Sequence, residues 1–180
     1  MTGVFKKNIL ILGGARSGKS ALAQNTAAQI GGKVLFCATA EALDEEMKSR
    51  IDEHKLSRPP GWDTLEAPSG VGRILAGLEK HYDVIVIDCI TILIANVMSK
   101  QDANKDVDSE VAIEIDGLLE FMGTDKSSCI LVSNEVGLGL VPDNRMGRIY
   151  RDILGRVNQR LAQHADEVYF MAAGLPLKIK

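Results

Sequence analysis

The sequence is poor in aromatic residues, which make up 4% of its 180 residues. It also has no excess of basic residues: 21 lysines and arginines stand against 24 aspartates and glutamates, for a formal net charge of −3. Proteins that stack successive bases need aromatic platforms, and proteins that bind duplex nucleic acid need a basic face. The composition therefore argues against a nucleic-acid partner, while a small anionic ligand needs only a local group of cations.

Paired cysteines and long apolar runs are also missing. Cys37, Cys89 and Cys129 have no CxxC spacing and lie in or beside apolar stretches, as reduced core residues do. The apolar stretch near the N-terminus is only a few residues long and leads into a glycine-rich turn, so it is too short for a signal peptide or a membrane span. We therefore expect a cytoplasmic chain without membrane insertion.

The length and the overall balance of residues suit one soluble domain. A chain of 180 residues fills one hydrophobic core well and is short for two. Apolar residues contribute 46% and charged residues 25%, which is ordinary for a globular protein. We expect a single nucleotide-binding domain over residues 1–180.

Short apolar runs alternate with segments of helical composition. The expected strands are Asn8–Leu12, Val34–Ala38, Asp83–Ile87, Cys129–Val132, Glu167–Met171 and Leu177–Ile179. The expected helices are Lys19–Ile30, Asp44–Ser57, Ile90–Met98, Ser109–Phe121 and Met146–His164. The polar stretch Met98–Ser109 is expected to be a mobile surface loop.

This alternation predicts an α/β fold, with a mostly parallel sheet that has helices on both faces. Ligands of such sheets bind at the carboxyl ends of the strands. The segments that follow Leu12, Cys37, Ile87 and Val132 are therefore the places to look for a site.

A phosphate-binding loop follows the first expected strand. Its sequence is Gly13-Gly14-Ala15-Arg16-Ser17-Gly18-Lys19-Ser20, a complete GxxxxGKS. The glycines allow backbone N–H groups to converge on phosphate oxygens, and the helix that follows directs its positive end at them. Lys19 then reaches the β- and γ-phosphates, and the Ser20 hydroxyl joins a magnesium shell. Strand, loop and helix occur in the required order, so the sequence predicts a P-loop NTPase-type, RecA-like domain.

Asp88 directly follows the apolar run that ends at Ile87. A carboxylate in this position orients the Mg²⁺ ion of P-loop enzymes. The alternative is that Asp88 only caps the helix that begins near Ile90.

His54 differs from the other two histidines, because helical spacing puts Arg50, His54 and Arg58 on one stripe. Neighbouring guanidinium groups disfavour the protonated imidazole, so His54 should stay neutral and nucleophilic. The same stripe is equally compatible with a solvated helix face. His81 and His164 each lie near an expected helix end, where a charged imidazole is favoured by the helix dipole, so a structural role accounts for both.

Taken together, the motifs resemble the adenosylcobinamide kinase/adenosylcobinamide-phosphate guanylyltransferase family over nearly the whole chain. They are the GGARSGKS loop, Ala38-Thr39-Ala40, Asp44-Glu45-Glu46-Met47 with Arg50-Ile51 and His54, Arg58-Pro59, Trp62, Asp88–Thr91, Asn134–Gly139 with Val141-Pro142, Arg151-Asp152, Gly155–Leu161 and Gly174. One departure is Ile92-Leu93-Ile94, where the family often carries a tryptophan, and it leaves the corrinoid side of the site open.

The resemblance implies two reactions in one domain. ATP or GTP phosphorylates adenosylcobinamide, and GTP then donates GMP to that phosphate through a guanylylated histidine, which corresponds to His54. The other implied site residues are Lys19 as catalytic residue and Ser20 and Asp88 as Mg²⁺ ligands. The implied nucleotide contacts are Gly13, Gly14, Ala15, Arg16, Ser17, Gly18, Lys19, Ser20, Ala38, Thr39, Ala40, Lys55, Leu56, Ser57, Arg58, Glu66 and Asp88. The family also implies a homo-oligomer, a trimer.

Glu66 has a physical reason to be in that set, because a carboxylate accepts hydrogen bonds from the guanine N1–H and N2–H₂ groups. It is also compatible with a plain surface position. Three other hypotheses remain at this point: a kinase without the second reaction, a non-catalytic nucleotide switch, and a RecA-like strand-exchange module, which the acidity and small size disfavour.

Overall fold

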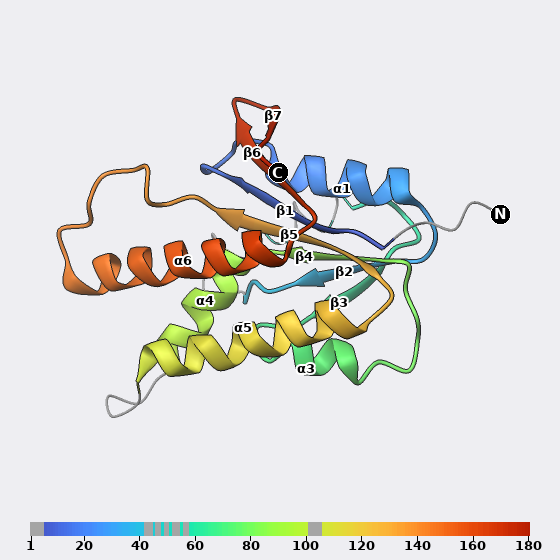
Figure 1. Ribbon diagram of the computed structural model, residues 1–180, viewed down its shortest axis with the longest axis horizontal. Coiled ribbons are helices and arrows are strands. Elements are labelled where there is room, and N and C mark those ends of the chain that lie inside the picture. The colour runs from blue at the N-terminus through green and yellow to red at the C-terminus, as the bar shows by residue number, and fades with distance from the viewer. Residues whose placement is uncertain are drawn as a thin grey trace.

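The computed structural model describes residues 6–41, 58–100 and 106–180, together with the single positions Glu45, Lys48, Ile51 and Lys55. Its strands form one seven-stranded sheet in the order β3-β2-β4-β5-β1-β6-β7 (Figure 1). The strands are β1 Asn8–Gly13, β2 Val34–Ala38, β3 Asp63–Glu66, β4 Val84–Asp88, β5 Ser128–Asn134, β6 Glu167–Ala172 and β7 Leu175–Lys178. All neighbouring strands pair in parallel except β6 and β7, which form an antiparallel hairpin at one edge. The expected α/β class and mostly parallel sheet are confirmed.

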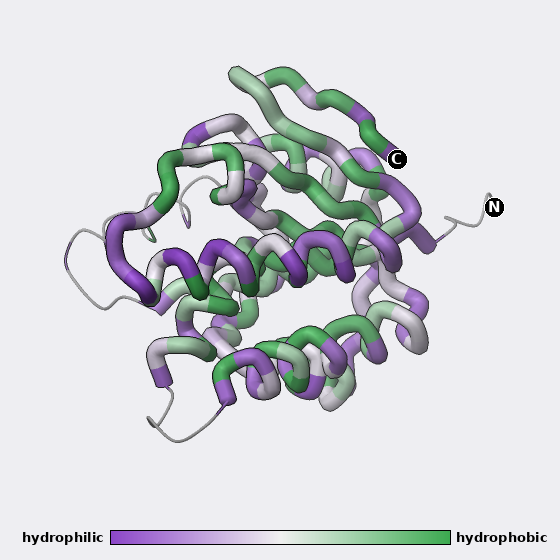
Figure 2. The backbone as a smooth tube through the Cα atoms, turned by 60° about the vertical axis from the view of Figure 1, so that its left-hand side comes forward, coloured by the Kyte–Doolittle hydropathy of each residue, from purple (hydrophilic) through white to green (hydrophobic). Residues whose placement is uncertain are grey.

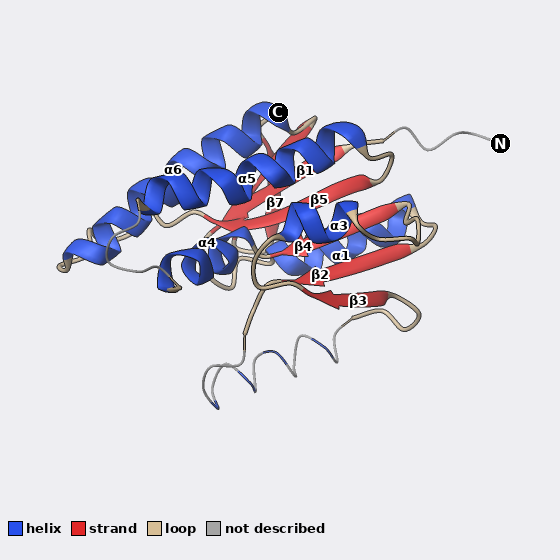
Figure 3. Cartoon of the chain, turned by 90° about the horizontal axis from the view of Figure 1, so that it is seen from below, coloured by secondary structure: helices blue, strands red, loops and turns tan. Residues whose placement is uncertain are grey.

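Helices cover both faces of this sheet, as Figures 1 and 3 show. They are α1 Lys19–Ile30, α3 Val71–Ala76, α4 Ile90–Ser99, α5 Val107–Thr124 and α6 Arg145–His164. Helix α1 lies on one face, and the other four helices lie on the opposite face. The helix α1 has the bounds expected from its alanine-rich sequence and its glycine C-cap at Gly31.

Alternate residues of each strand face the two layers. In β1, Ile9 and Ile11 pack toward Ala23 and Ala27 of α1, whereas Leu10 packs into the larger cluster under the other helices. The central strands are apolar on both sides for this reason, and they form the hydrophobic interior in Figure 2. Burying one such aliphatic side chain stabilises the fold by about 1.5–3 kcal/mol.

The short helix α3 was not expected from the sequence. Its six residues lie between Gly70 and Gly77 and are too few to produce a clear period. A carboxylate of α5 completes its first turn: Glu114 accepts hydrogen bonds from Gly70 N at 2.6 Å and Val71 N at 2.8 Å. The helix therefore depends on a partner more than forty residues away along the chain.

Other boundaries also differ from expectation. The loop expected over Met98–Ser109 is wrong at both ends, because α4 continues to Ser99 and α5 begins at Val107. Asp106 caps α5 by accepting a hydrogen bond from Asp108 N. The helix expected over Asp44–Ser57 lies largely outside the described residues. The four positions of this segment that are described are helical: Glu45, Lys48, Ile51 and Lys55.

The three cysteines are buried and free, as expected. Within the described part of the chain, no helix combines the length and the apolar character needed to cross a membrane.

Candidate nucleotide-binding site

The phosphate loop connects the end of β1 to the start of α1. Gly13 has a φ of +150°, and a side chain there would lie 2.6 Å from the carbonyl oxygen of Met171, so only glycine fits. Gly18, the N-cap of α1, has a φ of +95°, which also favours glycine. The loop is closed by hydrogen bonds from Ser17 N to Gly14 O at 3.3 Å and from Gly174 N to Ser17 O at 3.1 Å. The expected strand, loop and helix are therefore present in the expected order.

Lys19 is buried at the first position of α1, and only 7% of it is exposed. Its Nζ donates a hydrogen bond to Gly14 O at 2.6 Å, so the ammonium lies over the loop. Burial lowers the pKa of Lys19, and nearby Cys89 and Asp88 oppose that shift. Because the Lys19 ammonium is already largely removed from water, replacing Gly14 O by phosphate oxygens costs little further desolvation.

A cavity of about 420 Å³ lies beside the loop at the carboxyl ends of the strands. It is lined by Ala15, Arg16, Lys19, Ser20, Phe36, Ala38, Ala40, Ile51, Arg58, Glu66, Asp88, Cys89, Ile92, Val132 and Asn134. The carboxyl ends of the strands, where a parallel sheet is expected to bind its ligand, thus meet at one cavity.

Arg58 is held in the cavity wall by an aromatic ring. Its guanidinium carbon lies 4.2 Å from the ring centroid of Phe36, and its Nη1 donates to Thr64 Oγ1 at 3.3 Å. Its Nε is buried and has no hydrogen-bond partner among the described residues. Burial lowers the pKa of Arg58, against the opposing effect of Asp88 and Glu66. A partly buried guanidinium with a spare donor at its buried Nε is suited to an anionic ligand.

Glu66 ends strand β3 and lines the same cavity. Its Oε1 lies 2.8 Å from the ammonium of Lys55. The hydrogen bond from Lys55 lowers the pKa of Glu66, with a smaller contribution from Arg58. The carboxylate is therefore ionised and can accept hydrogen bonds from a ligand.

Ser20 and Asp88 face the cavity from α1 and from the end of β4. The N-cap of α4 is Cys89 rather than Asp88, so the capping alternative for Asp88 is wrong. The carboxylate of Asp88 acts electrostatically on both Lys19 and Arg58. A hydroxyl and a carboxylate oxygen at one cavity form a donor set that suits Mg²⁺.

Thr39 lies behind the wall rather than in it. Its Oγ1 donates to Cys89 O at 2.8 Å and accepts from Cys89 N at 2.9 Å, and its backbone N donates to Asp88 O at 3.2 Å. Its carbonyl accepts from the side chain of Asn96 at 2.8 Å. Thr39 therefore braces the turn after β4, while its neighbours Ala38 and Ala40 line the cavity.

Several other expected site residues do not line the cavity. Gly13, Gly14, Ser17 and Gly18 shape the loop behind it, and Lys55 reaches the site through Glu66. The expected residues Arg50, His54, Leu56 and Ser57 lie outside the described residues. His164 lies in the last turn of α6, near a helix end as expected.

The sequence did not assign six lining residues to the site: Phe36, Ile51, Cys89, Ile92, Val132 and Asn134. Asn134 had a usable signal, because it follows the apolar run of β5. Its backbone is fixed from two sides, by Thr91 Oγ1, which accepts from Asn134 N at 2.7 Å, and by Asn158 Nδ2, which donates to Asn134 O at 3.1 Å. Ile92 occupies a place at the cavity where the family resemblance left the contacts open.

The loop, the parallel sheet and the cavity define a P-loop nucleotide-binding protein of RecA-like fold. Among solved structures, the chain is similar to a crystal structure of the RadB recombinase, with a TM-score of 0.51 and 16% sequence identity over 91% of this chain and 73% of that chain. At that identity the likeness concerns the fold alone.

Sequence comparison identifies the family. A model of the family described as cobinamide kinase / cobinamide phosphate guanyltransferase matches residues 9–179. The chain belongs to this family of transferases. It is 39% identical to the bifunctional adenosylcobalamin biosynthesis protein CobU of Escherichia coli (strain K12), over 96% of this chain and 99% of that protein. It is 41% identical to the CobU protein of Salmonella typhimurium over the same shares, and 42% identical to the CobP protein of Pseudomonas aeruginosa over 95% of this chain and 96% of that one.

Proposed function

We propose that this chain phosphorylates the aminopropanol hydroxyl of adenosylcobinamide with ATP or GTP, and then transfers GMP from GTP to the new phosphate through a guanylylated His54. The observation that carries the proposal is one cavity that joins Lys19, Arg58, Asp88 and Glu66, in a chain that belongs to this family. Lys19 and Arg58 provide cations for the phosphates, and Asp88 provides an oxygen ligand for a metal ion. Glu66 provides a hydrogen-bond acceptor for the nucleotide base.

In the first reaction the substrate hydroxyl attacks the γ-phosphorus. The bond to the bridging oxygen breaks, the nucleoside diphosphate leaves and the hydroxyl proton passes to solvent. Phosphoryl transfer depends mainly on positioning and charge neutralisation. Backbone N–H groups of the loop and the ammonium of Lys19 supply both, because Lys19 already lies over Gly14.

Ser20 and Asp88 would hold Mg²⁺, since both line the cavity and offer oxygen ligands. When bound, the ion neutralises charge on the β- and γ-phosphate oxygens.

In the second reaction an imidazole nitrogen of His54 attacks the α-phosphorus of GTP, and pyrophosphate leaves. An oxygen of adenosylcobinamide phosphate then attacks the same phosphorus and releases the imidazole. Splitting the displacement in this way avoids a direct encounter of two bulky phosphates. The described neighbours of His54 in the sequence support the assignment: Ile51 lines the cavity and Lys55 pairs with Glu66.

Guanine selection is assigned to Glu66. The ionised carboxylate offers acceptors for N1–H and N2–H₂, whereas adenine presents an acceptor at N1. Arg58, with its spare buried Nε, is assigned to the phosphates. The remaining nucleotide contacts are assigned to the loop, to the residues around Thr39 and to the segment from Lys55. From the length and the short apolar runs of the sequence we also infer a single domain and a cytoplasmic location, and from the resemblance a homotrimer.

The decisive experiment offers the purified protein GTP labelled at the α-phosphate, first alone and then with adenosylcobinamide and ATP. We expect a covalent GMP adduct that maps to the peptide containing His54, and its discharge onto the phosphorylated corrinoid. Phosphorylation without any adduct would leave a kinase that lacks the second reaction. Absence of turnover with adenosylcobinamide would overturn the proposal.

A further inference from the structure

The carboxamide of Asn96, on helix α4, connects two strand ends that carry the cavity wall. Its Nδ2 donates to Thr39 O at 2.8 Å and to Pro68 O at 3.1 Å. Thr39 follows β2, and Pro68 follows β3. Asn96 is only 6% exposed; its bond to Thr39 is buried and its bond to Pro68 is partly buried.

The two carbonyls lie next to lining residues. Thr39 stands between Ala38 and Ala40, which both line the cavity, and Pro68 comes two residues after Glu66. Asn96, Thr39 and Pro68 are themselves absent from the lining, so Asn96 acts on the site only through the backbone that it holds. We call the lining formed by Ala38, Ala40 and Glu66 the β2–β3 wall.

Few side chains can replace Asn96 at this position. A primary amide nitrogen carries two N–H donors without a charge, and here each donor is matched to one carbonyl. Leucine has about the same size but no donor, and would deprive the buried Thr39 carbonyl and the partly buried Pro68 carbonyl of this hydrogen bond. Further hydrogen bonds reinforce this connection. Thr39 Oγ1 bonds to the backbone N and O of Cys89, and Ala67 N donates to Ala38 O at 2.9 Å.

We propose that Asn96 is a positioning residue that holds the β2–β3 wall at the separation required for guanine and thereby sets the preference for guanine nucleotides. The inference rests on the proposed function, in which this wall reads the base. A shift of either carbonyl moves Ala40 or Glu66 relative to the other, and base selection depends on polar groups that are well matched in position. The phosphate loop is held by other contacts, so phosphate binding should respond less.

The test compares GTP with ITP, which lacks only the 2-amino group. We measure kcat and KM for both in guanylyl transfer, and Kd for GDP and IDP by calorimetry, which requires no turnover. In Asn96→Leu the preference for GTP over ITP should fall about tenfold, mostly through KM, while kcat stays within about threefold. Asn96→Ala is the second variant, because the smaller side chain leaves space in which water can reach the carbonyls.

Asn158→Leu is the matched control. Asn158 is 5% exposed and makes one buried bond, with Ser133 Oγ at 2.7 Å, and one partly buried bond, with Asn134 O at 3.1 Å, as Asn96 does. It braces the end of β5, which pairs with Gly13 of the phosphate loop, so it should affect GTP and ITP alike. Thermal unfolding of all variants separates loss of stability from loss of selection.

Glu66→Gln distinguishes the inference from the proposed contact. If Glu66→Gln relaxes the preference and both Asn96 variants keep it, the role of Asn96 is overturned and the contact stands. If the Asn96 variants relax it and Glu66→Gln does not, the wall selects the base without Glu66. If neither relaxes it, or if Asn158→Leu relaxes it equally, the inference is wrong.

Discussion

The ammonium of Lys55 lies 2.8 Å from Oε1 of Glu66, at the end of strand β3. The side chains are 46% and 61% exposed, and ion pairs of this kind contribute only about 0–1 kcal/mol to stability. The consequence is electrostatic: the hydrogen bond from Lys55 holds the pKa of Glu66 below its usual value, which further favours the ionised carboxylate. The pair also joins Lys55, the residue that follows His54 in the sequence, to Glu66 of the cavity wall.

Glu66→Gln should raise the KM for GTP in guanylyl transfer about tenfold and leave the KM for ATP in the kinase reaction nearly unchanged. The amide has one acceptor oxygen and two donors, so it mismatches the guanine edge. Steady-state kinetics with each nucleotide measure the effect. Equal increases for GTP and ATP would show that Glu66 contacts a part common to both nucleotides.

Lys19→Ala should lower kcat/KM of both reactions by a factor of about 100 or more, because a phosphate-clamping cation is lost from a buried position. Lys126→Ala, an exposed lysine just before β5, serves as the control. If both activities stay within about tenfold of wild type, a loss of only ~1.4 kcal/mol, Lys19 does not act in the transition state.

His54→Ala should abolish the acid-labile, alkali-stable GMP adduct and the second reaction, while phosphorylation of adenosylcobinamide survives. The kinase reaction needs no covalent intermediate, which is the physical reason for the difference. Denaturing electrophoresis after incubation with α-labelled GTP measures the adduct. His81→Ala and His164→Ala should still take up label, and labelling of His54→Ala itself contradicts the assignment. If both reactions fail together, circular dichroism and a GTP titration must establish whether the variant still folds and binds.

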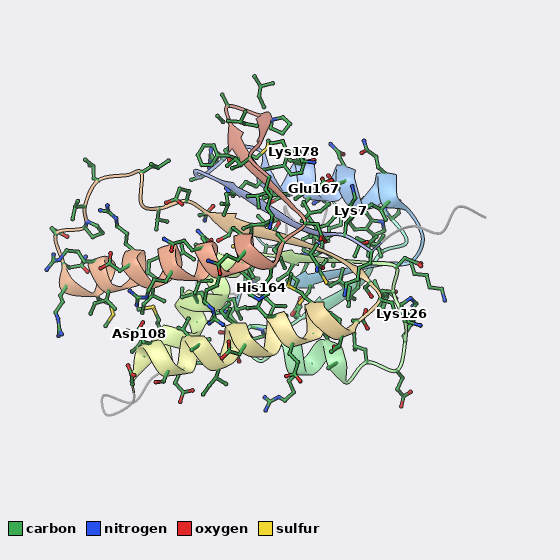
Figure 4. All side chains as sticks on the ribbon, in the orientation of Figure 1. Lys7, Asp108, Lys126, His164, Glu167 and Lys178 are labelled. Atoms are coloured by element: carbon green, nitrogen blue, oxygen red, sulfur yellow. The ribbon has the colours of Figure 1, made fainter. Side chains whose placement is uncertain are left out.

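Glu167 at the start of β6 should make stability depend on acidic pH. Its Oε1 lies 2.6 Å from Lys7 Nζ and 3.2 Å from Lys178 Nζ (Figure 4), and Tyr169 OH donates to its Oε2 at 2.8 Å. The hydrogen bond from Lys7, with the others, lowers the pKa of Glu167 from 4.5 to about 2. A depressed folded-state pKa contributes stability that is complete above the unfolded value and disappears as the pH falls through the folded one.

Glu167→Gln should therefore cost about 1–2 kcal/mol of unfolding free energy near neutral pH, a value reduced for solvent screening because both lysines are half-exposed. The difference from wild type should shrink as the pH falls from about 4.5 toward 2. Urea unfolding across this range measures it, with the exposed Glu120→Gln as the control. A difference that is independent of pH would mean that packing rather than charge is lost.

Gly72 and Gly117 form a matched pair at the contact of α3 with α5. A methyl group on Gly72 would overlap the backbone of Gly117, whereas one on Gly117 would meet nothing within 4 Å. We expect Gly72→Ala to destabilise the protein by about 3 kcal/mol through forced separation of the helices. Gly117→Ala should stabilise it by about 0.5–1 kcal/mol, because alanine suits a helix interior better. Similar unfolding midpoints for both variants would contradict the close contact.

Local pattern alone was sufficient for helix α1 and strand β2. The expected bounds of α1 and β2 are those of the structure, because a buried parallel strand is a continuous apolar run and an alanine-rich helix ends at glycine. The same logic led to Lys19, Ser20 and Asp88, since the chemistry of a P-loop is written in consecutive residues and in the ends of strands. Family resemblance contributed Glu66 and Arg58, which periodicity alone leaves ambiguous.

Only the tertiary structure decided which distant residues hold helix α3 and the cavity wall in place. Helix α3 exists where Glu114 of α5 caps it, Arg58 is held by the ring of Phe36, and Asn96 joins the ends of β2 and β3. Each contact joins residues that are distant in the sequence, and each depends on the strand order β3-β2-β4-β5-β1, in which chain neighbours are not always sheet neighbours. The sequence pattern indicates that a residue will be buried or will pair with another residue. Which residue becomes its partner is determined by packing across the sheet.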